Sequence, residues 1–189
     1  MNRLSFTVEN YRASVAGDKT QTRRCHPKAR YAVGEIVALT LPHWRGHNAV
    51  GSVWDEVLRE TRWQHERTGQ TCYLSLGAYT PSEDHSRWRL CPAFLMPVWS
   101  CLHFAEILGT RAERVQDITH VDCVAEGIYA CPGGWRYPGR PSMLPFSSAR
   151  DAYACEWYTL NAERPGCAWA DNPWVLVYDY RLCEKPEAT

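Results

Sequence analysis

The segment GDKTQTRR, residues 17–24, lies between two different hydrophobic patterns, and the fold can be inferred outward from it. Before it, LSFTVE (4–9) alternates apolar and polar residues as a strand does, and NYRASVAG (10–17) fits a short helix. After it, YAVGEIVALTL (31–41) predicts a strand preceded by a turn at Gly34. The segment itself contains no apolar residue, so its row of hydrogen-bond donors is a candidate binding surface.

The middle of the chain gives weaker patterns. A helix is expected over 52–69, a strand over 71–79 and a polar loop over 81–89. The stretch 96–118 is expected to form a strand, a turn near Gly109 and a second extended piece.

The last third of the chain alternates helices and loops before a final strand. A short helix is predicted over 119–128, with Thr119 as its N-cap, and a Gly- and Pro-rich loop over 131–145. An amphipathic helix over 147–163 and a closing strand over 173–182 follow. We expect Trp174, on that last strand, to belong to the core.

Several strands with few helices indicate an α+β fold that is mainly β. We expect a small β-barrel with flanking helices, formed as a single domain by residues 1–189.

Composition excludes some classes of protein. Lys and Arg together number 21 and Asp and Glu together 21, so the formal net charge is zero, which disfavours a protein that coats nucleic acid. The nine cysteines are irregularly spaced without a CxxC pair, which predicts mostly buried or unreactive thiols in a reducing compartment. No apolar run resembles a signal peptide or a membrane span, so a cytoplasmic protein without membrane association is expected.

Five motifs in a fixed order carry a family resemblance: GDKTQTRR (17–24), YAVGEIVALT (31–40), MPVWS (96–100), AERVQDITHVDCVAEGI (112–128) and NPWVLVYDY (172–180). Together they resemble the ASCH-domain family of the PUA-like superfold, especially its longer phage and prophage members. The segments at about 42–90 and 131–145 fall outside the resemblance and are expected to be family-divergent insertions. The resemblance implies a PUA-like barrel with a cleft under flanking helices.

The family also implies candidate site residues. Relatives are proposed to bind RNA, and one bacterial branch hydrolyses the acetyl amide of acetylated cytidine with a lysine, a threonine and a glutamate. By motif, these catalytic residues correspond to Lys19, Thr22 and Glu126. The neighbouring residues that would bind the ligand are Thr20, Arg23, Arg24 and Trp99. No cofactor or metal is expected.

The residues are chemically suited to amide hydrolysis, which needs a nucleophile, a base and a donor for the developing oxyanion. Thr22 is a nucleophile only if a neighbour takes its proton. Lys19 would do this when neutral and would stabilise the oxyanion when charged, while Glu126 would act as a general acid or base. The alternative is structural: the Lys19–Thr22 segment ties a turn, and Arg23 and Arg24 pair with carboxylates.

Two features bear on the ligand. Arg24 suits a phosphate because its guanidinium donates in a bidentate manner, and Trp99 either stacks on a base or belongs to the core. Relatives often carry arginines where this chain has Val98 and Leu102, which makes long RNA a weaker candidate.

Four hypotheses therefore stand. The first is a module that binds RNA or a modified nucleoside or nucleotide in a cleft lined by the KTQTRR turn. The second is an amidohydrolase acting on an N-acylated cytidine-type nucleoside. The others are a ribonuclease and a phage accessory protein whose partner is a host protein.

Overall fold

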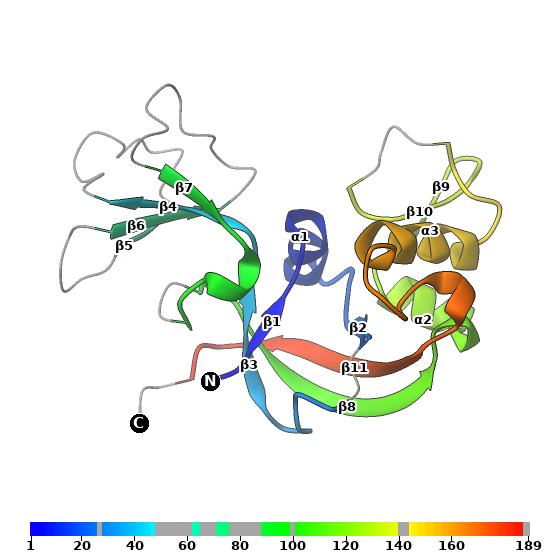
Figure 1. The fold of residues 1–189 in the computed structure, drawn as a ribbon, viewed down its shortest axis with the longest axis horizontal. Coiled ribbons are helices and arrows are strands. Elements are labelled where there is room, and N and C mark those ends of the chain that lie inside the picture. Colours follow the sequence, from blue (N-terminus) through cyan, green and yellow to red (C-terminus); the bar gives the residue numbers. More distant parts are fainter. Residues whose placement is uncertain are drawn as a thin grey trace. The chain divides into compact units, whose positions relative to one another are not determined.

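The computed structural model of the chain describes residues 1–25, 28–47, 62–64, 71–75, 88–98, 101–139 and 144–186 (Figure 1). The fold is mixed α+β and consists mainly of strands, as the sequence predicts. The chain divides into two compact units. Unit 1 comprises Met1–Tyr11 and Val37–Phe104, and unit 2 comprises Arg12–Ile36 and Ala105–Thr189.

Unit 1 contains a parallel strand pair and a four-stranded sheet. Strand β1 (Arg3–Ser5) pairs in parallel with β3 (Ile36–Thr40). The predicted strand over 31–41 is confirmed at 36–40, whereas the one over 4–9 is confirmed only at 4–5 and is wrong at 8–9, which belong to a helix. The sheet has the order β5-β6-β4-β7 and is antiparallel throughout. Its strands are β4 (His43–His47), β5 (Arg62–Gln64), β6 (Thr71–Ser75) and β7 (Trp88–Cys91), and a short 3-10 helix, η3 (Ala93–Leu95), follows β7.

This sheet corrects two predictions for the middle of the chain. The predicted helix over 52–69 is wrong at residues 62–64, and the predicted loop over 81–89 is wrong at 88–89, because both stretches form strands. In both stretches the pairing with another strand overrides the local pattern, since β5 pairs with β6 and β7 pairs with β4. The predicted strand at 71–79 is confirmed for 71–75, and the rest of these segments lies outside the described residues.

Unit 2 is built on β8 (Phe104–Arg114), β11 (Trp174–Cys183) and β2 (Gln21–Arg24), which are neighbours in that order. Strand β11 runs antiparallel to β2, with Thr22 opposite Tyr178. Strand β2 is the edge strand, and the described strands of this unit do not close into a barrel.

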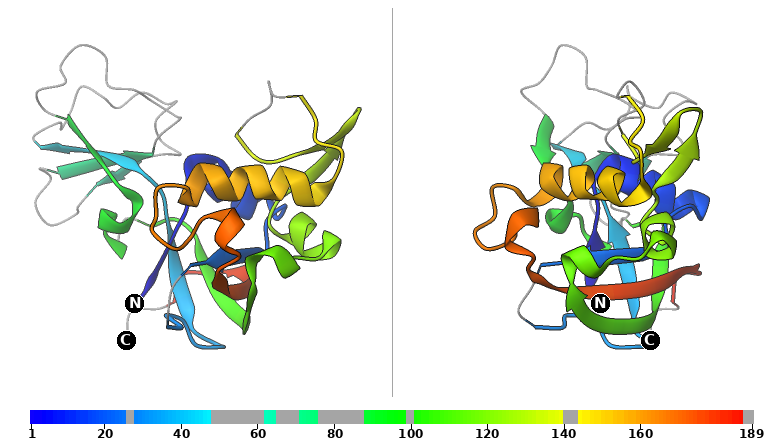
Figure 2. Two further views of the ribbon diagram at one scale, coloured as in Figure 1. Left: turned by 45° about the vertical axis from the view of Figure 1, so that its right-hand side comes forward. Right: turned by 90° about the vertical axis from the view of Figure 1, so that its right-hand side faces the viewer.

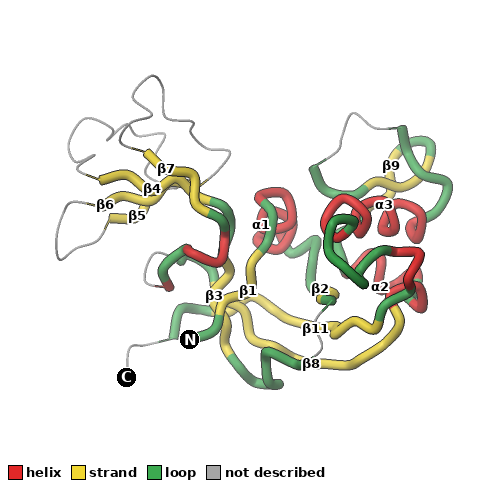
Figure 3. The backbone as a smooth tube through the Cα atoms, in the orientation of Figure 1, coloured by secondary structure: helices red, strands yellow, loops and turns green. Residues whose placement is uncertain are grey.

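Strand β8 continues through Gly109 without the turn that the sequence predicts (Figure 3). A Cβ atom at Gly109 would lie 3.1 Å from Asp179 Oδ2, so the glycine makes room for a side chain of β11. Close approach between strands, and not a turn, explains this glycine.

Helices α2 (His120–Ala125) and α3 (Ala149–Asn161) lie over one face of β8 and β11 (Figure 2). Both predicted helices are confirmed. Thr119 caps α2 in a reciprocal capping box with Asp122, and Ser148 caps α3. The core between helices and sheet contains Val115, Ile118, Cys123, Ile128, Ala152, Trp157, Val175 and Val177.

The remaining elements are short. Helix α1 (Val8–Ala16) matches the predicted helix at 10–17, and the 3-10 helices are η5 (Val115–Asp117) and η6 (Trp169–Asp171). The predicted loop over 131–145 is wrong in part, because Cys131 ends β9 (Tyr129–Cys131) and β10 (Gly134–Arg136) pairs with it in a hairpin. None of the helices in the described part of the chain is long and apolar enough to cross a membrane.

Two further predictions are corrected in unit 2. Trp174 is 59% exposed instead of buried, because the alternation of β11 turns Val175 and Val177 into the core. Cys25 and Cys167 form a disulfide across 142 residues of sequence, so these two are not free thiols. Sequence spacing alone cannot reveal such a pair, because the fold brings its members together.

Candidate functional site

Three residues of the KTQTRR segment lie on one face of the chain: Lys19, Gln21 and Arg23. All three are at least 95% buried, and the Arg23 Nη1 atom donates to Gln21 Oε1 at 2.5 Å. Residues two apart on a strand share a face, so β2 presents a set of polar side chains inward. The intervening Thr22 lies on the opposite face of β2.

Lys19 contacts Glu126, which lies 107 residues further along the chain. The Lys19 Nζ atom forms an ion pair with Glu126 Oε2 and donates to the Glu126 carbonyl oxygen at 2.7 Å. The backbone N–H of Thr20 also donates to the Ala125 carbonyl, at 2.8 Å, which ties the segment to the end of α2. The structure thus brings together two of the three residues for which the family resemblance implies catalytic roles.

The geometry at the end of α2 depends on Gly127. Its φ is +95°, and a Cβ atom there would lie 3.3 Å from the Cβ of Lys19. A glycine both permits the left-handed conformation and leaves space for the lysine. The helix end predicted from sequence therefore also fixes where Glu126 meets Lys19.

Arg23 binds three carboxylates. Its guanidinium lies 2.6 Å from Glu113, 3.2 Å from Asp122 and 3.1 Å from the second oxygen of Glu126. Burial by itself would lower the pKa of Arg23, but the charges of Glu126 and Glu113 outweigh it and raise this pKa. Arg23 therefore pairs with carboxylates, which is the structural alternative that the sequence offered to a role in ligand binding.

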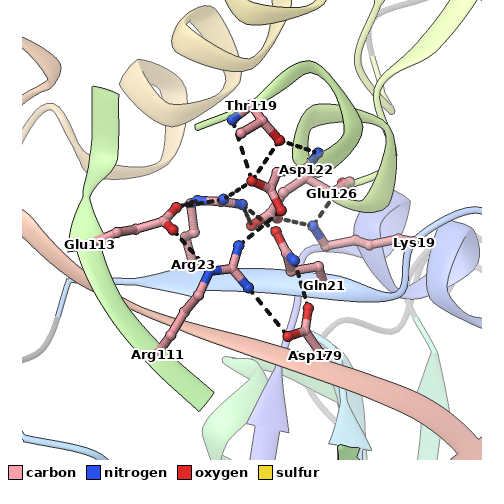
Figure 4. Close-up of polar contacts among 9 residues, drawn as sticks. All are labelled: Lys19, Gln21, Arg23, Arg111, Glu113, Thr119, Asp122, Glu126 and Asp179. Atoms are coloured by element: carbon pink, nitrogen blue, oxygen red, sulfur yellow. Dashed lines mark hydrogen bonds and ion pairs between the residues drawn. The ribbon is translucent and has the colours of Figure 1, made fainter. Parts of the chain in front are cut away.

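Arg111 extends this cluster toward the surface. Its guanidinium binds Glu113 at 2.9 Å, Asp122 at 2.8 Å and Asp179 at 3.2 Å, and Gln21 donates to Asp179 at 2.5 Å (Figure 4). We call the ionised side chains of Lys19, Arg23, Arg111, Glu113, Asp122, Glu126 and Asp179 the ion-pair cluster. It contains three cations and four carboxylates, a formal charge of 3 − 4 = −1.

Sequence reasoning missed four members of the cluster: Arg111, Glu113, Asp122 and Asp179. The alternation of Arg111 and Glu113 on β8 was the available signal, because both face one side of the strand. Their partners come from β2, α2 and β11, and only the fold brings those elements together.

Asp122 has the clearest electrostatic perturbation in the cluster. Burial would raise its pKa, but hydrogen bonds from Thr119 and Gln21 and the charge of Arg23 together lower the pKa to about 2. Asp122 therefore caps α2 and at the same time serves as a fixed anion beside Arg23 and Arg111.

The remaining candidate residues are Thr20, Arg24 and Trp99. Thr20 is exposed, and Trp99 lies outside the described residues. Burial lowers the pKa of Arg24, against the opposing effects of Tyr31 and Glu126. Arg24 thus lies near aromatic side chains.

The described residues contain no group of three or more His, Cys, Asp or Glu side chains arranged to hold a metal ion. Comparisons with family models, with characterised proteins and with solved structures gave no match to this chain. The resemblance to ASCH domains stays a prediction from the ordered motifs.

Proposed function

We propose that the chain is an ASCH-type, PUA-like domain that binds a modified pyrimidine nucleoside, free or within RNA, at the Lys19–Glu126 pair. One observation carries the proposal: a lysine and a glutamate, each at least 95% buried, meet between the KTQTRR segment and the end of α2. These are two of the positions for which the motifs imply a ligand site.

The energetics of the pair favour a binding role over a purely structural one. A buried ion pair gives little net stability, because the desolvation of both charges offsets their attraction. Stability alone therefore does not account for a lysine and a glutamate buried together, which makes the pair a candidate site.

The hydrogen-bonding capacity of the pair fits the edge of a base. A lysine ammonium has three N–H donors, and among the described residues Glu126 accepts two of them, through its carboxylate and its carbonyl oxygen. The third N–H remains for a ligand acceptor, and the adjacent carboxylate can accept from a ligand amine. A cytosine-type edge presents its ring nitrogen N3, an acceptor, directly beside its exocyclic amine, a donor.

The charge of the cluster favours recognition through the base and not through phosphate. Arg23 already binds three carboxylates, and the cluster has a formal charge of −1. A phosphate placed there would meet more negative than positive charge. The proposed ligand is therefore a nucleoside or a splayed-out base.

A second candidate function, hydrolysis of an N-acylated cytidine-type nucleoside, is favoured by the direct contact of Lys19 with Glu126. Glu126 would take a proton from water as the water oxygen attacks the acyl carbon, and Lys19 would donate to the developing oxyanion. Collapse would break the C–N bond, and the proton would pass to the leaving amine, giving a carboxylate and a free nucleoside. Water is the nucleophile in this scheme, since Thr22 lies on the other face of β2.

The test combines binding and turnover on the purified protein. Cytidine and N4-acetylcytidine are titrated by calorimetry, and deacylation is followed by ultraviolet absorbance. We expect binding by the natural chain and at least a tenfold loss in Glu126→Gln and Lys19→Met. Glu106→Gln is the matched control, because it removes an exposed ion pair with Arg181 outside the cluster.

The outcomes separate the candidates. Release of acetate that is lost in Glu126→Gln would establish the hydrolase, and binding without release would establish a binding module. Absence of binding by the natural chain, or equal binding by a folded Glu126→Gln variant, would refute the proposed site. Circular dichroism at the assay temperature establishes that each variant is folded.

A further inference from the structure

A pocket of about 830 Å³ opens on unit 2 and shares no residue with the ion-pair cluster. Part of its wall comes from β8 and β11, through Ala112, Arg114 and Trp174. On β8, Arg111 and Glu113 belong to the cluster, whereas Ala112 and Arg114 line the pocket. Successive side chains of a strand point to opposite faces, so the two sites use opposite faces of β8.

The chemistry of the pocket differs from that of the cluster. Its lining includes two arginines, Arg114 and Arg164, and one carboxylate, Asp171. Within the described part of the chain, neither arginine has a carboxylate within ion-pair distance. The lining therefore has a formal charge of 2 − 1 = +1, and both guanidinium groups remain available to an anion.

Both arginines are held in place by neutral groups. Arg114 donates to the Asn172 carbonyl at 3.0 Å, and its guanidinium lies 4.8 Å from the ring centroid of Trp174. Arg164 donates to Asn161 at 3.0 Å and to the Cys25 carbonyl at 3.3 Å. Positioned cations whose partners are uncharged keep their affinity for a ligand anion.

The disulfide forms part of the same wall. Cys25 follows β2, Cys167 lies three residues after Arg164, and both line the pocket. Because Arg164 donates to the carbonyl of Cys25, the disulfide fixes both the arginine's loop and its acceptor. The position of Arg164 therefore depends on the fold in two places: at its own loop, which Cys167 anchors, and at its acceptor, the carbonyl of Cys25.

Trp174 supplies an aromatic surface in the pocket. It is 59% exposed, although it lies on a central strand whose neighbouring residue Val175 is buried. Exposed tryptophan beside arginine is the combination that stacks on a base and binds the attached phosphate.

We propose that this pocket, the Arg164–Trp174 pocket, is a second binding site that takes a nucleotide unit, with the base on Trp174 and the phosphate on Arg164 and Arg114. The ligand class follows from three features together: an exposed indole, two arginines without carboxylate partners and a volume sufficient for a base with its sugar phosphate. The site is independent of the Lys19–Glu126 pair, and a nucleotide unit can come from a free nucleotide or from a single strand.

The experiment uses the full chain with its disulfide intact. Uridine monophosphate, uridine, inorganic phosphate and a single-stranded tetrauridylate are each titrated by calorimetry. We expect the monophosphate to bind at least tenfold more tightly than uridine or phosphate, because only it engages both the ring and the arginines. Tighter binding of the tetranucleotide would identify a strand as the source of the nucleotide, and equal binding would identify a free nucleotide.

Variants assign the binding to this pocket. Trp174→Ala and Arg164→Gln should each weaken monophosphate binding about tenfold, since stacking on an aromatic side chain and a charge-assisted contact are each large enough for such a loss. Both side chains are exposed, so both variants are expected to fold. Arg150→Gln is the matched control, because Arg150 also stacks on a tryptophan, at 5.4 Å from the Trp169 ring, yet does not line the pocket.

Three results would overturn the proposal. They are no binding of the monophosphate at millimolar concentration, inorganic phosphate binding as tightly as the monophosphate, and monophosphate binding that is unchanged in both pocket variants. Monophosphate binding retained in Glu126→Gln would show that the pocket acts separately from the Lys19–Glu126 pair. A loss of binding in Glu126→Gln alone would assign the nucleotide to the ion-pair cluster and refute the second site.

Discussion

The two faces of β8 carry arginines in opposite situations. Arg111, which points toward the helices, joins Arg23 in a cluster that is saturated by carboxylates. Arg114 and Arg164, in the pocket on the other face, have only neutral partners among the described residues. An arginine-rich segment is therefore not by itself an anion site, because the fold can supply carboxylates that occupy its arginines.

The largest expected effect comes from removing the buried cation of the ion-pair cluster. Arg23→Ala leaves the carboxylates of Glu113, Asp122 and Glu126 without their shared cation. Removal of one partner from a buried ion pair typically costs about 3–5 kcal/mol, because an uncompensated charge stays buried. Urea unfolding followed by circular dichroism should give a loss in this range, and a loss below about 1 kcal/mol would contradict the buried cluster.

The second prediction concerns the covalent tie beside the pocket. The disulfide between Cys25 and Cys167 spans 142 residues of sequence. Closure of so long a loop stabilises a fold by up to about 5 kcal/mol, and typical disulfides contribute about 2–4 kcal/mol. We expect the Cys25→Ser, Cys167→Ser double variant to be less stable by about 3 kcal/mol.

The control for this prediction is the free thiol Cys155, which lies elsewhere in unit 2. Cys155→Ser should change the urea midpoint little. Free-thiol titration of the unreduced natural protein gives an independent check, since reactive Cys25 or Cys167 would mean that the disulfide is not formed.

The third prediction is that the ion-pair cluster, and not the Arg164–Trp174 pocket, makes the stability of the protein depend on pH. The pKa of Asp122 is lowered to about 2 from an ordinary value of 3.8. A lowered pKa means that the carboxylate stabilises the fold above pH 4 and that this contribution disappears as the pH falls from about 4 to 2. Because the group lies near the surface, screening limits the contribution to about 1 kcal/mol.

Unfolding measured from pH 2 to 7 should therefore change less with pH in Asp122→Asn than in the natural chain. Arg23, Arg111, Thr119 and Gln21 all face this carboxylate and stay in place in the variant. Identical pH profiles in the two proteins would contradict the proposed role of Asp122.

The smallest expected effect on stability concerns Arg114 in the Arg164–Trp174 pocket. Arg114 lies over an exposed tryptophan, and a cation–π contact at such a site contributes about 0.5–1 kcal/mol. Arg114→Gln should thus change the stability by less than about 1 kcal/mol while weakening monophosphate binding. A large loss of stability would show that Arg114 has a structural role similar to that of Arg23.

Local sequence signals were sufficient to predict several of the helices and strands. The cap at Thr119, helix α2, helix α3 and the last strand all follow from capping residues and from hydrophobic periodicity. The ordered motifs also led to Lys19 and Glu126 as members of one site, and the structure places them in contact.

The partners of the individual side chains depend instead on the tertiary fold. It turned Arg23 toward three carboxylates, left Trp174 exposed, joined Cys25 to Cys167 and used Gly109 to admit Asp179. The physical reason is that capping and periodicity act over a few residues. Ion pairing, burial and disulfide formation depend instead on distances in space between segments that are far apart in the chain.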